Sequence, residues 1–227
     1  VTAEGRAVVT ALLDRLLGLG ATPVEADTDG VYFVPPPGHA EAGDEALLAR
    51  LAAGLPPGIQ LELDGRYAAM FSYKMKTYAL LDERGRLLLK GSAFRSRGLE
   101  PFLRQLIEQI VRALLAGRSQ EVRRLVDGWL EDFAAHRVAP RVFARTETLQ
   151  ASLDAYREKV AAGARPLSAP YELAIASGRA VQPGDQLSYY VAGRTAGVAV
   201  NEYARLASEW DPARPDENVE YYQAKVR

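Results

Sequence analysis

The sequence contains no cysteine, which excludes a disulfide framework and a cysteine-based zinc site. Its only two histidines, His39 and His136, lie far apart along the chain and argue against a histidine-rich metal site or a Ser-His-Asp triad. No apolar run approaches the roughly 20 residues that a membrane helix needs, so no membrane partner is expected. What remains is an ordinary balance of 48% hydrophobic and 25% charged residues, which allows a core of typical size.

Charged residues are unevenly distributed along the chain, although the formal net charge is only −1. Residues 1–64 hold ten acidic and three basic side chains, whereas residues 74–97 hold seven basic and two acidic ones. An acidic segment followed by a basic one suits a protein that binds metal cations in one place and phosphates in another. A solvated surface is the alternative explanation of the same pattern.

The hydrophobic periodicity predicts an α+β fold. Helical spacing of apolar residues occurs in residues 2–19, 40–53, 99–115, 122–133 and 152–162. Short β patterns occur in residues 22–26, 31–34, 67–73, 76–81, 86–90 and 186–191. Turns are predicted at Asp64-Gly65 and Arg84-Gly85, and further short β elements with loops are predicted in the tail. The change from β to helical pattern places a domain boundary near Arg97-Gly98.

The sharpest chemical feature is the acidic turn Asp27-Thr28-Asp29-Gly30 between two short strands. Two carboxylates held this close repel each other unless a cation or a proton lies between them. Their oxygen ligands suit Mg²⁺, and such carboxylates hold the ions of two-metal phosphoryl transfer. Taken alone, the tetrapeptide is more simply explained by turn chemistry, because Asp and Gly favour tight turns.

Basic residues follow the acidic segment and are candidates for sequence-independent phosphate contacts. These candidates are Lys74, Lys76, Lys90, Arg95 and Arg97. Tyr78 can pack on a sugar or bond to a backbone oxygen of a nucleic acid. The alternative is that Lys and Arg alternate on the exposed face of a half-buried sheet. The apolar residues from Leu99 to Phe133, with Trp129 among them, are interpreted as core, and His136 as structural or exposed.

The stretch from Glu25 to Phe33 resembles the catalytic hairpin motif of family B DNA polymerases, whose usual form is a tyrosine, a spacer and Asp-Thr-Asp-Ser. Glu25 stands at the tyrosine position and Gly30 at the serine position, while both aspartates are present. The stretch from Tyr73 to Ala79 resembles the Lys-Lys-x-Tyr-type motif of the family, with Met75 and Thr77 at positions that are often basic. Further resemblances are found at Lys90-Gly91, Arg95-Ser96-Arg97, Pro170–Ala174, Gly184–Val191 and Asn218–Tyr222.

The resemblance implies the C-terminal part of a family B DNA polymerase, with residues 1–97 as the end of the palm and residues 98–227 as a mostly helical thumb. By family analogy, Asp29 is a direct metal ligand and Asp27 its close support, in a two-Mg²⁺ site completed by residues outside this sequence. The implied partners are primer-template DNA, deoxynucleoside triphosphates and the rest of the polymerase, namely its N-terminal, exonuclease and fingers segments. The implied location is cytoplasmic and nucleoid-associated. Half a metal site should not polymerise, so no activity is expected from this chain alone.

Several alternatives stay open at this point. The chain is either the small subunit of a naturally split polymerase or a piece of a single longer enzyme. A non-catalytic DNA-binding subunit derived from the same fold is a second function consistent with the residues. A third is an unrelated α+β protein with a carboxylate metal site and a small-molecule phosphate ligand.

Overall fold

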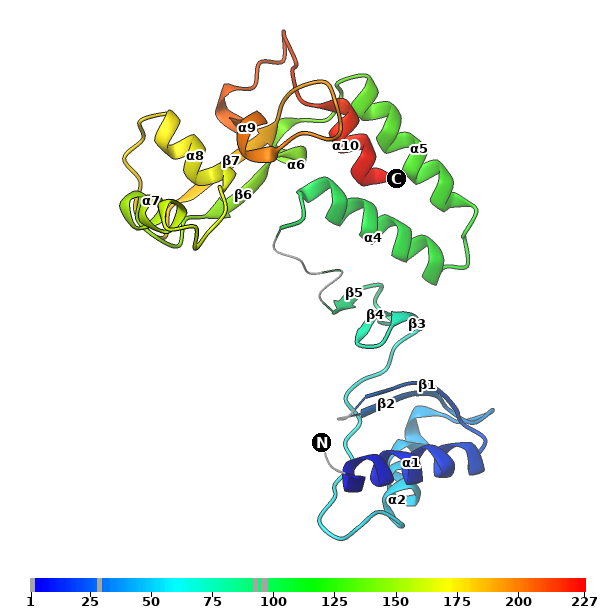
Figure 1. Cartoon of the computed structure of the whole chain (residues 1–227). Coiled ribbons are helices and arrows are strands. Elements are labelled where there is room, and N and C mark those ends of the chain that lie inside the picture. The colour runs from blue at the N-terminus through cyan, green and yellow to red at the C-terminus, as the bar shows by residue number, and fades with distance from the viewer. Residues whose placement is uncertain (1–2, 28–29, 92–93, 95–97) are drawn as a thin grey trace. The chain divides into compact units, whose positions relative to one another are not determined.

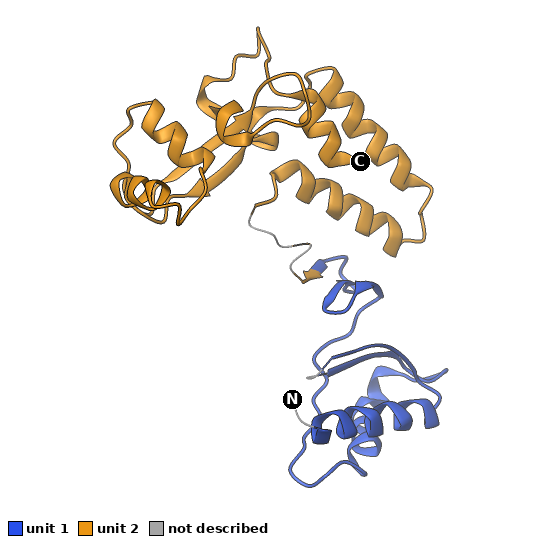
Figure 2. Cartoon of the chain, in the orientation of Figure 1, with its two compact units in different colours: residues 1–88 blue, residues 89–227 orange. Residues whose placement is uncertain are grey.

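The computed structural model describes residues 3–27, 30–91, 94 and 98–227, and it has the predicted α+β fold (Figure 1). The chain forms two compact units, Val1–Leu88 and Leu89–Arg227 (Figure 2). The boundary expected from the sequence lies slightly further along the chain, between residues 97 and 98, and the assignment of palm and thumb to its two sides stays a prediction. Within the described residues, no helix is both long and apolar enough to cross a membrane.

The first unit begins with two helices and a two-stranded antiparallel sheet. Its elements are α1 (Ala3–Gly18), β1 (Thr22–Asp27), β2 (Gly30–Val34), the 3-10 helix η1 (Glu41–Gly43) and α2 (Asp44–Ala52). Leu16 of α1 and the i, i+4 pair Leu47 and Leu51 of α2 are buried together. Val31 and Phe33 of β2 pack against this cluster. The helices therefore hold the acidic hairpin through its apolar residues.

The chain continues into the predicted antiparallel meander, in the order β3-β4-β5, whose last strand spans the boundary between the two units. Its strands are β3 (Ala69–Lys74), β4 (Thr77–Leu81) and β5 (Leu87–Lys90), and Gly85 takes a positive φ of 78° in the predicted turn between the last two. The hairpin expected at Asp64-Gly65 is wrong, because residues 61–68 form no strand. Arg66 instead donates from Nε to Asp44 at the start of α2, at 3.1 Å, and this contact holds the segment beside the helix.

The second unit combines helices with a three-stranded antiparallel sheet of order β6-β7-β8. The strands are β6 (Arg145–Thr148), β7 (Gln186–Val191) and β8 (Ala204–Leu206), followed by the 3-10 helix η2 (Ala207–Glu209). The helices are α4 (Pro101–Leu115), α5 (Glu121–Ala134), α6 (Pro140–Phe143), α7 (Leu153–Ala161), α8 (Ala169–Ala176), α9 (Val200–Tyr203) and α10 (Val219–Val226). The tail is thus more helical than the sequence pattern predicts. Pro170 favours the first turn of α8, and Asn218 caps α10.

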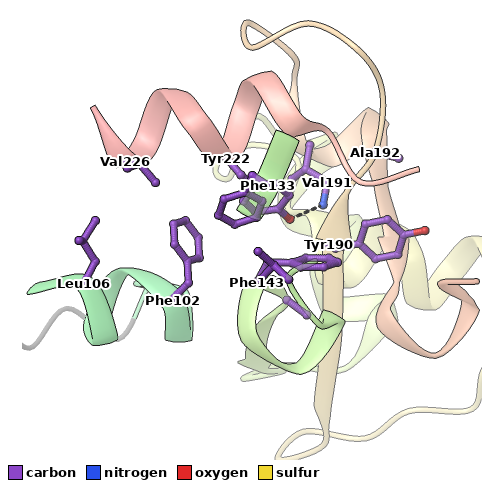
Figure 3. Close-up of a cluster of buried hydrophobic side chains, with 11 residues drawn as sticks. Phe102, Leu106, Phe133, Phe143, Tyr190, Val191, Ala192, Tyr222 and Val226 are labelled. Carbon is purple, nitrogen blue, oxygen red and sulfur yellow. Dashed lines mark hydrogen bonds between the residues drawn. The ribbon is translucent and has the colours of Figure 1, made fainter. Parts of the chain in front are cut away.

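The central strand β7 separates two buried clusters of the second unit. Leu187 and Tyr189 face a cluster that includes Ala174 of α8 and Leu206 of β8. Tyr190, on the opposite face, belongs to the larger cluster shown in Figure 3, whose aromatic members are Phe102, Phe133, Phe143, Tyr190 and Tyr222. Because successive residues of a strand point to opposite faces, one apolar run serves both clusters. The stretches that resemble the family late in the chain therefore supply core residues of this unit.

Glu217 is a buried carboxylate that joins distant segments of the second unit. Its side chain bonds to Nδ1 of His136 at 2.7 Å and accepts from Nε1 of Trp210 at 2.7 Å. His136 follows α5 in a left-handed conformation, with φ of 54°, and is thereby oriented toward the segment that precedes α10. These contacts satisfy both carboxylate oxygens and give His136 a structural role.

Asn218 combines a helix cap with a loop anchor, and it is fully buried. Its Oδ1 accepts from the backbone N–H of Tyr221 at 3.0 Å, while Nδ2 donates to the carbonyls of Ala192 and Thr195 at 3.2 and 2.8 Å. We expect Asn218→Ala to lower the free energy of unfolding by about 2 to 4 kcal/mol, because a cap and two donors to backbone carbonyls are lost.

Urea unfolding followed by circular dichroism measures this loss, and another side-chain helix cap provides the control. Ser152 caps α7 through Oγ, which accepts from Ala155 N–H at 3.3 Å in an exposed position. Ser152→Ala should therefore cost about 1 kcal/mol or less. Equal losses in the two variants would show that the donors of Asn218 contribute nothing beyond the cap.

Candidate nucleic-acid and metal site

In the acidic hairpin, β1 ends at Asp27, whose register partner on β2 is Gly30. The two residues between them, Thr28 and Asp29, lie outside the described residues, so the predicted metal ligand Asp29 stays a prediction. Glu25 and Asp27 are two residues apart on β1 and share one face of the strand. A register irregularity falls between Pro23 and Glu25. The hairpin thus presents Glu25 and Asp27 in the same direction.

The basic hairpin is formed by β3 and β4, in which Lys74 pairs with Thr77 across a two-residue turn of Met75 and Lys76. Lys76 has a positive φ of 60°, a conformation that residues other than glycine adopt uncommonly. The side chain of Met75 is 80% exposed. The turn therefore orients Lys76 through a constrained backbone and presents Met75 to solvent.

The two hairpins contact each other through register pairs. Glu25 pairs with Tyr32 across the acidic hairpin, and Ser72 pairs with Tyr78 across the basic hairpin. Ser72 donates from Oγ to Glu25 Oε2 at 2.6 Å, and the hydroxyls of Tyr32 and Tyr78 are hydrogen-bonded at 3.2 Å. One cross-strand pair of the acidic hairpin therefore contacts one cross-strand pair of the basic hairpin. We call these four residues the hairpin clasp.

The aromatic half of the hairpin clasp is partly withdrawn from water. The rings of Tyr32 and Tyr78 meet edge to face, with centroids 5.2 Å apart, and Tyr67 lies against Tyr32 on another side. Burial and the hydrogen bond with Tyr78 raise the pKa of Tyr32 above its ordinary value. The hydroxyl of Tyr32 therefore keeps its proton at neutral pH. The phenol of Tyr78 already has a protein partner at the position where the resemblance implies a nucleic-acid contact.

A double-mutant cycle tests the contact between these two hydroxyls. Either Tyr32→Phe or Tyr78→Phe removes the same hydrogen bond, so the double variant should be little less stable than either single variant. We expect a coupling of about 0.5 to 1.5 kcal/mol in the free energy of unfolding. Tyr73, which is 63% exposed, provides the control, and Tyr73→Phe should change little. Additive losses at Tyr32 and Tyr78 would contradict the contact.

Lys76 and Asp27 form an ion pair beside the hairpin clasp, with Nζ 3.3 Å from Oδ1. Both side chains reach solvent, since Lys76 is 63% exposed and Asp27 is 39% exposed. The structure therefore brings together one predicted metal-site carboxylate and one predicted phosphate-contacting lysine. Sequence reasoning identified each of these residues but did not predict that they would touch.

The remaining predicted contact residues are distributed along the basic segment. Lys74 is exposed, with Nζ 5.8 Å from the centroid of the Tyr73 ring, and Lys90 is exposed at the end of β5. Neither has an ion-pair partner among the described residues. Arg95 and Arg97 lie outside the part of the chain that the structure describes.

The sequence analysis did not predict three members of the hairpin clasp as site residues, namely Glu25, Tyr32 and Ser72. For Glu25 a signal existed, because strand alternation places it on the same face as Asp27. No sequence signal marks Ser72, whose role depends on how one hairpin docks on the other.

A divalent metal would find only part of a ligand set here. Asp27 supplies a solvent-accessible carboxylate at the end of a strand, the kind of oxygen ligand that Mg²⁺ accepts. Within the described ranges, no group of three or more potential ligand side chains comes together. The donors fit one side of a carboxylate site, and a complete site would need further ligands beyond the described residues.

Comparison of structures identifies the class of fold as that of a family B DNA polymerase. The chain is similar to the family B DNA polymerase from the hyperthermophilic archaeon Pyrobaculum calidifontis, with a TM-score of 0.74 at 20% identity. The likeness covers 99% of this chain and 28% of that polymerase chain. The α+β fold therefore corresponds to part of such a polymerase.

Sequence comparison leads to particular relatives that carry the name DNA polymerase. The chain is 28% identical over 226 residues to DNA polymerase 1 of Pyrococcus abyssi and 29% identical over 230 residues to the DNA polymerase of Desulfurococcus sp.. It is 27% identical over 230 residues to the DNA polymerase of Thermococcus kodakarensis. Each likeness covers 98% of this chain. No family model matches the chain.

The resemblance to family B DNA polymerases is thus confirmed in sequence and in fold. The chain spans 28% of the length of the relatives from Pyrococcus abyssi and Desulfurococcus sp., and 13% of the relative from Thermococcus kodakarensis. Activity, substrates and partners of the whole enzymes are consequently proposals for this chain.

Proposed function

We propose that this chain is the C-terminal palm and thumb portion of a family B DNA-directed DNA polymerase. In this role it supplies part of a two-metal nucleotidyl-transfer site and part of the grip on primer-template DNA. Deoxynucleoside triphosphates are the substrates, and the remaining palm, fingers, exonuclease and N-terminal segments are the protein partners. The observation that carries the proposal is the docking of the basic hairpin on the acidic hairpin, which places Lys76 beside Asp27.

The residues of the acidic hairpin hold metal in this proposal. Asp29 is the direct ligand and Asp27 supports it, together with carboxylates contributed by the other polymerase segments. Bound Mg²⁺ would supply stabilisation of the attacking and leaving oxygens during phosphoryl transfer. The hairpin clasp holds the strand of Asp27 in place while the loop residues bind the ions, because its four side chains link both hairpins away from their ends.

The residues of the basic segment hold nucleic acid. Lys74, Lys76, Lys90, Arg95 and Arg97 neutralise phosphates of the primer-template duplex, and Tyr78 lines the surface next to them. Such contacts suit a polymerase, because phosphates are the same in every sequence. Their joint signature is a steep loss of duplex binding with rising salt concentration.

The experiment that tests the proposal is a pull-down of the tagged chain from its source cells, followed by Mg²⁺-dependent primer extension. Extension by the captured assembly supports a polymerase completed by partner segments. The purified chain alone should not extend a primer, because it brings only part of the ligand set, and extension without a partner would contradict this expectation.

The same preparation separates the alternative functions. Salt-sensitive binding to primer-template without extension by any assembly would support a non-catalytic DNA-binding subunit of the same fold. Absence of both extension and duplex binding would contradict both of these functions. A gel-shift titration at several salt concentrations gives this readout.

A further inference from the structure

We propose that Lys76 is an exchangeable counter-ion of Asp27, which makes nucleic acid and divalent cations promote each other's binding to the first unit. A phosphate draws the ammonium of Lys76 away from Asp27, and the carboxylate then attracts a cation more strongly because this counter-ion no longer neutralises it. The inference rests on the proposed function only in taking nucleic-acid phosphate and a divalent cation as the two ligands.

The geometry allows the exchange, because the same ammonium of Lys76 pairs with Asp27 and can pair with a phosphate. Nζ of Lys76 is 3.3 Å from Oδ1 of Asp27, within the range of a direct ion pair. An ammonium that also pairs with a phosphate neutralises the carboxylate less completely than one that pairs with the carboxylate alone. Likewise, a divalent cation on Asp27 would repel the ammonium at so short a range. Occupation of either group therefore favours release of the other.

The surrounding contacts allow the lysine side chain to move while the strands stay in place. The hairpin clasp fixes Glu25 to Ser72 and Tyr32 to Tyr78, so the two backbones keep their register without the ion pair. Lys76 is anchored by the left-handed turn, but its side chain is 63% exposed and has four flexible bonds. Asp27 is more enclosed, at 39% exposed. The movable partner of the pair is thus Lys76.

Reciprocity gives the exchange a measurable consequence. If bound nucleic acid improves the affinity for a cation by some factor, bound cation must improve the affinity for nucleic acid by the same factor. An exposed ion pair corresponds to about a twofold to fivefold change in an equilibrium constant. The coupling is therefore modest, and it is best detected by a cycle of variants under metal-free conditions.

The test measures binding of a labelled primer-template duplex by the full chain in metal-free buffer at constant low salt. The variants are Asp27→Asn, Lys76→Gln and the double substitution. Asp27→Asn should tighten binding by about twofold to fivefold when Lys76 is present, because the ammonium is released to the duplex. In the Lys76→Gln background the same substitution should have less than half of that effect. An equal effect in both backgrounds would overturn the exchange.

Lys74 provides the matched control for loss of one positive charge in the same hairpin. It has no ion-pair partner among the described residues, so Asp27→Asn should tighten binding equally in the wild-type and Lys74→Gln backgrounds. Equal coupling of Asp27→Asn to Lys74→Gln and to Lys76→Gln would show only a general electrostatic effect. This result would overturn a specific exchange. Urea unfolding of every variant establishes that each is folded under the conditions of the titration.

A second measurement uses Mn²⁺ as the cation and its effect on water proton relaxation as the readout. Addition of duplex should strengthen Mn²⁺ binding by the wild-type chain and should leave binding by the Lys76→Gln variant nearly unchanged. Equal strengthening in both chains would contradict the exchange. If the wild-type chain fails to bind the duplex at all, the proposed function fails and the exchange fails with it. Duplex binding with an additive cycle overturns the exchange alone.

Discussion

Replacing Asp29 by Asn is expected to lower primer extension by the assembled enzyme about a thousandfold, while duplex binding changes little. Asn keeps the shape of the side chain but lacks the charge that a divalent cation requires. Loss of several kcal/mol of metal-dependent stabilisation corresponds to a change of about this size. Single-turnover extension by the pulled-down assembly, compared with binding of the same duplex, separates the chemical step from the grip on DNA.

Asp64 provides the matched control for this substitution. It is an exposed carboxylate of the same unit, away from the acidic hairpin in sequence, and Asp64→Asn should leave extension within about twofold of the wild type. An Asp29→Asn assembly that extends a primer at an undiminished rate would remove Asp29 from the metal site. Loss of duplex binding together with extension would instead indicate a structural role for the loop.

Replacing Phe133 by Ala is expected to lower the free energy of unfolding of the second unit by about 3 to 5 kcal/mol. Phe133 is fully buried, its ring stacks on Tyr222 with centroids 5.2 Å apart, and it meets Phe102 edge to face at 4.9 Å. Figure 3 shows Phe133 and Tyr222 at the centre of the cluster, next to Phe143. Truncation therefore leaves a cavity among rings that cannot close over it.

Urea unfolding followed by near-ultraviolet circular dichroism reports on this aromatic cluster directly. Leu167 is 53% exposed, so Leu167→Ala provides a control for truncation of an apolar side chain outside the core. The control should lose less than about 0.5 kcal/mol. A loss at Phe133 no larger than that of the control would contradict the packing of this cluster.

The sequence pattern predicts the long amphipathic helices and the hairpins well. The apolar stripes of α4 and α5 repeat over several turns, so their periodicity is unambiguous. The prediction of a hairpin at Asp64-Gly65 was wrong, because turn-favouring residues do not determine whether the segments on either side pair as strands. Arg66 bonds to Asp44 instead. The short helix α8 was missed because it is apolar all round and shows no helical stripe.

In the candidate site too, the local features can be predicted from the sequence, whereas the tertiary contacts cannot. Strand alternation by itself is enough to place Glu25 and Asp27 on one face of β1. The contact of Lys76 with Asp27 cannot be predicted this way, because it depends on the docking of two hairpins whose tyrosines are 46 residues apart. Register within a hairpin is a local property, whereas register between hairpins is fixed by side chains such as Ser72.

The position of α10 in the core has a consequence for how the second unit folds during synthesis. Tyr222 and Val226 of this helix share the main cluster with Phe102 and Leu106 of α4, and Lys225 is paired with Glu100 across 125 residues of sequence. Contacts of such long range carry a large loop-closure entropy and form late. The unit therefore cannot complete its core on the ribosome until α10 has emerged, and the aromatic residues of the cluster stay without their full packing until then.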